Sequence, residues 1–273
     1  MKIKLSIAAL VVACAPQAQA GPVFSAASYT ADVVFRDVLS YTTMPLTYDG
    51  TSYWSTSGGY TGGLREARYD AAGVATGTFS PGLDFRSIFT DGSNNVLARQ
   101  FSDGTIYRQT SPGVFASSGV GLAGLDNQSA VALNSAGQYV AMKGGDVRVY
   151  DAAGALASTF KLNGYYSGYV ADRGIAAAGA YLFTYFNQVV SAWDYTGALI
   201  DSARLSGAGT GFDSYYSFSY ANNRFFVVDG SGGNWRGFNA NLSSGNSVPE
   251  PSSLTLSLLA LGTGLGVLRR RAA

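Results

Sequence analysis

Aspartate is the residue whose type and spacing point most directly to chemistry in this chain. Five aspartates recur at intervals of 47, 42, 46 and 41 residues, and they are Asp37, Asp84, Asp126, Asp172 and Asp213. Hard cations such as Ca²⁺ prefer oxygen ligands, so these carboxylates would form a cation site if the fold gathered them in a ring. Alternatively, each aspartate accepts backbone N–H bonds and fixes its own turn. We favour the turn role.

The chain lacks the residue types that most other catalytic and metal-binding sites require. Histidine is absent, and the one cysteine, Cys14, lies in an N-terminal apolar stretch. Ser-His-Asp and Cys-His catalysis, histidine-bound zinc and disulfides in the mature chain are therefore excluded. Residues 21–251 contain only two glutamates, Glu66 and Glu250. A glycosidase would have to use a pair of aspartates, and nothing in the sequence distinguishes one pair.

Charge and glycine patterns also exclude nucleotide and nucleic-acid binding. Residues 21–251 hold 13 Lys or Arg against 17 Asp or Glu, a net charge of −4, which is opposite in sign to a phosphate-binding domain. No glycine-rich phosphate loop leads from a strand into a helix, because the pattern predicts no helix before residue 254.

Tyrosines form clusters that suit sugar binding as well as packing. The clusters are Tyr165-Tyr166 with Tyr169, Tyr215-Tyr216 with Tyr220, and Tyr53-Trp54 with Tyr60. Aromatic faces stack on the apolar faces of sugar rings, and nearby Asn and Asp can bond hydroxyl groups. Packing between strands explains the same clusters.

A repeat of about 43 residues positions all these side chains. Near copies of Tyr-Asp-Ala-Ala-Gly begin at Tyr69 and Tyr150, a third variant begins at Trp193, and degenerate copies contain Tyr107 and Phe238. The aligned aromatic residues are separated by 38, 43, 43 and 45 residues. One aromatic per repeat is typical of a core position. The aspartates that follow, as in Asp70, Asp151 and Asp194, belong to turns in which Gly73, Gly154 and Gly197 supply positive φ.

Each repeat contains four short β-prone runs joined by Gly, Asp, Asn or Pro turns. In the second repeat these runs are 87–90, 96–101, 106–109 and 114–116. The matching second runs elsewhere are 51–55, 139–143, 181–186 and 224–229. A four-stranded antiparallel unit of this length is the blade of a β-propeller. A β-sandwich or a β-solenoid is the alternative, but a sandwich has no reason to repeat and a solenoid rung is usually shorter.

The sequence thus predicts an all-β propeller of about five four-stranded blades across residues 21–247. Residues 29–36 supply either the outer strand that closes the ring or the remnant of a sixth blade. The glycine and aspartate turns followed by an aromatic strand resemble those of NHL-like propellers, although no family signature is complete. This resemblance implies that the first strand of each blade lines the channel. It also implies that the five spaced aspartates lie on the face where propeller ligands usually bind.

The N-terminus has the organisation of a secretory signal peptide. Lys2 and Lys4 precede an apolar stretch, and small residues at Ala18 and Ala20 lie before Gly21. This predicts residues 1–20 as a signal peptide cleaved by signal peptidase after Ala20. The apolar stretch, near ten residues, is short for a retained anchor. The segment ending at Cys14 loosely resembles a bacterial lipobox, which leaves lipidation of that cysteine as an alternative.

The C-terminus carries three ordered elements within residues 248–273. They are a tripeptide of Pro249, Glu250 and Pro251, an apolar segment at 254–268, and an arginine cluster of Arg269, Arg270 and Arg271. The segment 252–268 would span about 25 Å as a helix, enough to cross a locally thinned bilayer. The arginines belong on the cytoplasmic side, which puts the preceding domain outside the inner membrane. A simple membrane anchor is the alternative interpretation.

These three elements resemble the PEP-CTERM sorting signal of Gram-negative bacteria. The resemblance implies recognition of the tripeptide by an exosortase, a membrane protease that removes the tail after transient anchoring. It also implies delivery to the cell surface or exterior of bacteria that produce exopolysaccharide.

Two functional hypotheses follow from these signals and the domain between them. The first is a structural, adhesive or glycan-binding surface or matrix protein that requires no cofactor. The second is a hydrolase or lyase that acts on surface glycans through aspartates. An enzyme should have a deep polar pocket with converging carboxylates, and a binding module should have shallow, aromatic-lined grooves repeated around the ring.

Overall fold

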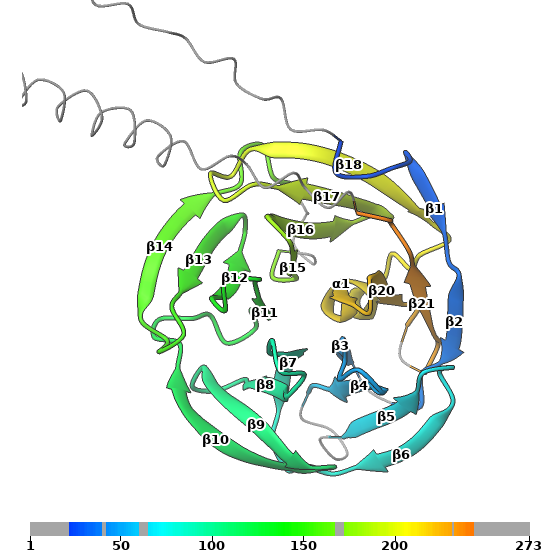
Figure 1. Ribbon diagram of the computed structural model, residues 1–273, viewed down its shortest axis with the longest axis vertical. Coiled ribbons are helices and arrows are strands. Elements are labelled where there is room, and N and C mark those ends of the chain that lie inside the picture. The colour runs from blue at the N-terminus through cyan, green and yellow to red at the C-terminus, as the bar shows by residue number, and fades with distance from the viewer. Residues whose placement is uncertain (1–21, 40–41, 60–64, 167–171, 231, 243–273) are drawn as a thin grey trace, which may run out of the picture. The chain divides into compact units, whose positions relative to one another are not determined.

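The chain forms a β-propeller of five blades around a central channel (Figure 1). The computed structural model describes residues 22–39, 42–59, 65–166, 172–230 and 232–242. The signal-peptide and sorting-motif residues lie outside this described part. Within each blade the first strand after the spaced aspartate is innermost. In blades 1 to 3 the strands follow in chain order outward, as the repeat predicts, and in blades 4 and 5 an N-terminal strand lies at the outer edge.

Four antiparallel strands form each of the first three blades. Blade 1 contains β3 (Thr43–Tyr48), β4 (Ser52–Ser57), β5 (Glu66–Asp70) and β6 (Ala75–Phe79). Blade 2 contains β7 (Phe85–Thr90), β8 (Val96–Gln100), β9 (Thr105–Ser111) and β10 (Val114–Gly121). Blade 3 contains β11 (Val131–Leu133), β12 (Tyr139–Lys143), β13 (Asp146–Tyr150) and β14 (Leu156–Lys161).

The last two blades recruit strands from the N-terminal part of the domain. Blade 4 contains β15 (Ala176–Ala178), β16 (Tyr181–Phe186), β17 (Val189–Trp193) and β18 (Leu199–Ser206), with β1 (Ser28–Thr30) added in parallel at its outer edge. Blade 5 contains β19 (Ser219–Ala221), β20 (Arg224–Val228), β21 (Asn234–Phe238) and, outermost, β2 (Val33–Arg36). The ring therefore closes by pairing β2 with β21, and the N-terminal segment is a closing strand rather than part of a sixth blade.

Repeated aspartate turns hold the third strand of a blade against the fourth. In the turn after β13, Asp151 Oδ1 accepts the N–H of Ala153 and of Ala155, both at 2.9 Å, while Gly154 has φ +85°. Asp70 and Asp194 make the same pairs of bonds in their turns. Because blades 1, 3 and 4 use the same turn, the register of their third and fourth strands is set locally and repeated.

The core lies between neighbouring blades, where the repeated aromatic residues meet. Tyr69, Tyr150, Trp193 and Phe238 are buried in the third strands, and Tyr107 packs half-buried at the interface of blades 1 and 2. The closing strand adds Phe35, whose ring lies 5.0 Å from that of Tyr69. The sequence interpretation of these aromatics as core is confirmed.

One helix departs from the expectation of no helix before residue 254. Helix α1 (Phe212–Ser217) begins after Gly211, which provides no side-chain cap, and its six residues give too short a pattern to detect. It packs against β3 and β20, and Ser217 Oγ accepts the N–H of Val228 at 2.9 Å. Within the described residues, no helix is long and apolar enough to cross a membrane.

Candidate functional site

The central channel has two chemically different ends. The innermost strands all run the same way, because each follows the fourth strand, counted from the channel, of the preceding blade. Their first residues and α1 lie at one end, here called the helix end. Their last residues and the turns that follow them lie at the other, the cavity end. The five spaced aspartates precede the innermost strands and so lie toward the helix end.

The aspartates of blades 2 to 4 are joined by cations that the sequence analysis did not single out. Asp126 accepts Arg173 Nε at 2.9 Å and Lys143 Nζ at 2.8 Å. Arg173 Nη1 also reaches Asp172, at 2.7 Å. Burial raises the pKa of Asp126, but the bonds from Lys143 and Arg173 outweigh it and lower that pKa to about 2. This carboxylate is thus ionised and cross-links two blades.

The same network continues into blade 2. Arg86 forms an ion pair with Asp84, donates from Nε to Gln128 Oε1 at 2.9 Å, and lies with its guanidinium 4.3 Å from the ring centre of Phe101. Arg99 is fully buried and donates to the backbone carbonyls of Asp126 and Asn127 at 3.0 and 2.6 Å. Arg86 lies two residues after Asp84, and Arg173 lies one residue after Asp172. An arginine close behind a spaced aspartate is the sequence signal that could have indicated these ion pairs.

Asp37 differs because its partners are neutral. It is buried, and it accepts the hydroxyls of Thr43 and Tyr69 at 2.5 and 2.9 Å and the N–H of Leu39 at 3.1 Å. Burial raises the pKa of Asp37 despite these bonds. Asp213 lies half-buried in the first turn of α1.

These arrangements give little support to the calcium hypothesis. No group of three or more Asp or Glu side chains in the described part of the chain is placed to hold a metal ion. Backbone N–H bonds contribute at Asp37 and Asp126. At Asp84, Asp126 and Asp172 the closest partners are arginine or lysine, a structural role that the turn interpretation did not include.

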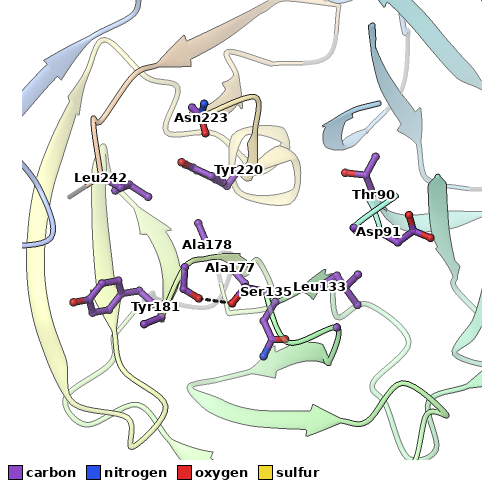
Figure 2. Close-up of a pocket in the computed structure, with 15 residues that line it drawn as sticks. Thr90, Asp91, Leu133, Ser135, Ala177, Ala178, Tyr181, Tyr220, Asn223 and Leu242 are labelled. Carbon is purple, nitrogen blue, oxygen red and sulfur yellow. Dashed lines mark hydrogen bonds between the residues drawn. The ribbon is translucent and has the colours of Figure 1, made fainter. Parts of the chain in front are cut away.

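The cavity end opens into a hollow of about 530 Å³ (Figure 2). Its walls come from the last residues of the innermost strands and from the turns beyond them. They include Thr90, Asp91, Leu133, Asn134, Ser135, Ala177, Ala178, Gly179, Tyr181, Tyr220, Asn223 and Leu242. The small side chains of residues 177–180 leave the space open. This run of Ala and Gly is the sequence signal for the cavity.

Two half-buried tyrosines form the aromatic part of the wall. Tyr181 and Tyr220 both pack on the buried ring of Phe183, with ring centres 6.5 and 6.4 Å away, and Tyr220 lies nearly parallel to it. Their contact with Phe183 fixes the orientation of both rings. Figure 2 shows them on the side of the cavity that also carries Ala178.

The polar groups of the wall are held in fixed turns. Asp91 Oδ1 accepts the N–H of Ser93 and of Asn95 at 2.9 and 3.0 Å. Burial raises the pKa of Asp91, but the bonds from Asn95 and Ser93 together with the charge of Arg108 outweigh burial and lower that pKa below its ordinary value, so the side chain is ionised. Ser135 Oγ donates to the carbonyl of Gly179 at 3.1 Å and joins the turns of blades 3 and 4 (Figure 2).

The fold assigns the tyrosines of the three clusters to different environments. Tyr53, Trp54 and Tyr215 are buried and belong to the core, and Tyr220 lines the cavity. Tyr166 is 78% exposed. Tyr60 and Tyr169 lie outside the described residues. Packing therefore explains much of the pattern, and one cluster contributes a ring to the candidate site.

Comparisons with known proteins identify the sorting signal and the architecture. The model of the PEP-CTERM protein-sorting motif matches residues 247–272. No curated protein matches the chain. Glutaminyl cyclase from Myxococcus xanthus is structurally similar, with a TM-score of 0.50 and 13% identity over 80% of this chain and 97% of that one.

Two other solved structures show a weaker likeness. A gluconolactonase from Xanthomonas campestris has a TM-score of 0.48 and 10% identity, covering 82% of this chain and 99% of that chain. Virginiamycin B lyase from Staphylococcus aureus has a TM-score of 0.40 and 14% identity, covering 74% and 71%. At 13% identity, the likeness to the glutaminyl cyclase shows the fold alone.

Proposed function

Because the chain joins a PEP-CTERM sorting motif to a five-bladed propeller, we propose that it is an exported surface or matrix protein that binds saccharide at the cavity end of its channel. The motif implies an exosortase substrate that is anchored transiently in the inner membrane. The signal peptide at residues 1–20 would start that export. The exopolysaccharide around such cells is the proposed source of the ligand.

The wall of the cavity supports a saccharide ligand. Sugar rings present an apolar face and a rim of hydroxyls, and the wall offers both matching surfaces. Tyr181 and Tyr220 supply aromatic rings, while Thr90 and Asn223 supply a hydroxyl and an amide group. A volume of about 530 Å³ has the size of a typical small-molecule site.

Glycan cleavage has weaker support than binding. Most glycoside hydrolases use two carboxyl groups about 5 to 9.5 Å apart, one of which has a raised pKa. Among the described lining residues the cavity has one carboxylate, Asp91, whose pKa is lowered and whose oxygens hold a turn. The geometry therefore favours a binding module over the hydrolase or lyase alternative.

Filling the cavity tests this proposal. In Ala178→Trp the new ring would occupy the space beside Tyr181 and Tyr220, and we expect saccharides found on a glycan array to bind at least tenfold more weakly by calorimetry. Ser102→Trp, at an exposed turn toward the helix end, is the matched control and should bind like the wild type.

A second variant guards against misfolding of the tryptophan variant. Asn223→Gly removes an amide from the wall and tolerates the φ of +58° at this position. It should also weaken binding. Saccharide binding that both cavity variants leave unchanged, or no saccharide binding by the wild type, would overturn the proposal.

A further inference from the structure

The cavity narrows inward into the channel. Behind the mouth lies a smaller space of about 190 Å³. The two spaces share four lining residues, each from a different blade, namely Thr90, Leu133, Ala177 and Tyr220. A ligand that enters the mouth is therefore enclosed by blades 2, 3, 4 and 5 and meets a constriction. This shape differs from an open groove, which would accept the middle of a polymer.

Helix α1 lies toward the opposite end, where it packs against β3 and β20. Tyr215 and Ser217 of this helix are buried, and Ser217 Oγ is bonded to the backbone of β20. Figure 1 shows α1 inside the ring of blades. End-on entry is therefore inferred from the narrowing at the cavity end, where the space of about 530 Å³ leads to one of about 190 Å³.

The charge of the wall limits the chemistry of the ligand. The described residues around the mouth and the constriction include no Lys or Arg, and their one ionised group is Asp91. Arg108 is 3.5 Å from Asp91 and is already paired with it. A uronate, sulfate or phosphate on the ligand would lose water without gaining a cationic partner, and that is unfavourable.

Resting on the proposed saccharide binding, we infer that the channel mouth binds the end of an uncharged glycan chain. The terminal sugar enters the constriction, and the next units contact Tyr181 and Tyr220 at the rim. A protein with this specificity attaches to neutral exopolysaccharide at chain ends.

Matched pairs of saccharides test the inference by calorimetry. Maltohexaose and linear β-1,2-glucan are compared with their cyclic counterparts, which have no ends. Oligogalacturonate is compared with its carboxyl-reduced, neutral form. We expect each linear glucan that binds to do so at least tenfold more tightly than its cyclic counterpart, and the neutral, carboxyl-reduced oligosaccharide to bind at least tenfold more tightly than oligogalacturonate. Ala178→Trp should weaken the binding of each of these ligands.

The possible failures are distinguishable. Equal affinity for linear and cyclic forms, or for acidic and neutral forms, together with sensitivity to Ala178→Trp, would overturn chain-end or neutral specificity and leave saccharide binding in place. If no saccharide shows binding that Ala178→Trp weakens, both the proposed function and this inference are overturned.

Discussion

At the residue scale, the ionisable side chains of this protein mostly serve contacts between blades. Asp126 and Arg173 connect blades 3 and 4, and Glu66 on β5 connects blade 1 to blade 2. A propeller without disulfides depends on such contacts together with its apolar core. The two carboxyl groups differ in their partners, so they should respond to pH in opposite directions.

Replacement of Arg173 should destabilise the protein at neutral pH. The pKa of Asp126 is lowered to about 2, so its contribution is present above its ordinary pKa near 4 and is lost as the pH falls toward 2. We expect Arg173→Gln to reduce the free energy of unfolding by about 1 to 2 kcal/mol at pH 7, since partial exposure screens the pair. Urea unfolding measures this change. Arg36→Gln, at an exposed position of β2, should stay within about 0.5 kcal/mol. Equal stability of the two variants would show that the ion pair contributes little.

Glu66 should make the protein less stable as the pH rises. Its carboxyl is fully buried and is bonded only to neutral donors, Gln109 Nε2 at 2.6 Å and the N–H of Gly113 at 2.8 Å. Burial raises its pKa to about 7, whereas the unfolded chain keeps a value near 4.5. The stabilisation is therefore complete below about pH 4.5 and is lost as the pH rises through 7, by about 3 kcal/mol in total.

The variant Glu66→Gln tests this pH dependence. Glutamine can keep the bond from Gly113 and donate to a reoriented Gln109 amide, so the interface stays intact without a charge. Urea unfolding at pH 4.5, 6 and 8 should show that the wild type loses about 3 kcal/mol relative to this variant. Parallel stability curves for the two proteins would contradict the raised pKa.

At the element scale, closure of the ring depends on one short strand. Strand β2 covers the edge of β21 that would otherwise be exposed, and an uncovered edge favours aggregation. Its central residue, Phe35, is 7% exposed and stacks against Tyr53 and Tyr69. Its neighbour Val34 points outward and is 52% exposed.

This alternation gives a matched pair of variants within β2. Phe35→Ala should reduce the free energy of unfolding by about 3 to 5 kcal/mol because it leaves a cavity among aromatic rings. Val34→Ala should change it by less than about 0.5 kcal/mol. Thermal and urea unfolding of both variants provide the measurement. A small effect of Phe35→Ala would mean that the ring closes without the packing of this strand.

At the scale of the whole molecule, the sorting motif implies that the propeller is exported as an exosortase substrate. Intact-mass spectrometry of protein from the native host should show Gly21 as the first residue and no residues 254–273. Replacing Pro249, Glu250 and Pro251 by alanine should leave the protein in the inner-membrane fraction, because the exosortase recognises the tripeptide. A full C-terminus in the secreted wild-type protein would contradict exosortase processing.

The sequence by itself determined the features that are local or repeated. The turn of Asp151 and Gly154 needs only a few neighbouring residues, and four β-prone runs per repeat suffice to define a blade. Because each blade packs mainly on copies of itself, the period also indicated the number of blades and the buried aromatic positions. The sorting motif was readable for the same reason, since its three elements are contiguous.

Only the tertiary structure decided which distant residues meet. Asp126 and Arg173 are 47 positions apart, and their ion pair depends on how two blades pack. The cavity is lined by strand ends of four blades. Its volume depends on small residues, and their role can be recognised only once the fold places Tyr181 and Tyr220 in the same wall. Spacing placed the five aspartates at equivalent positions, but it did not reveal their partners. Some of these lie in the same blade, as Arg86 does for Asp84, and some in the next, as Arg173 does for Asp126. Long-range packing therefore assigned them a structural role and put the cavity at the opposite end of the channel.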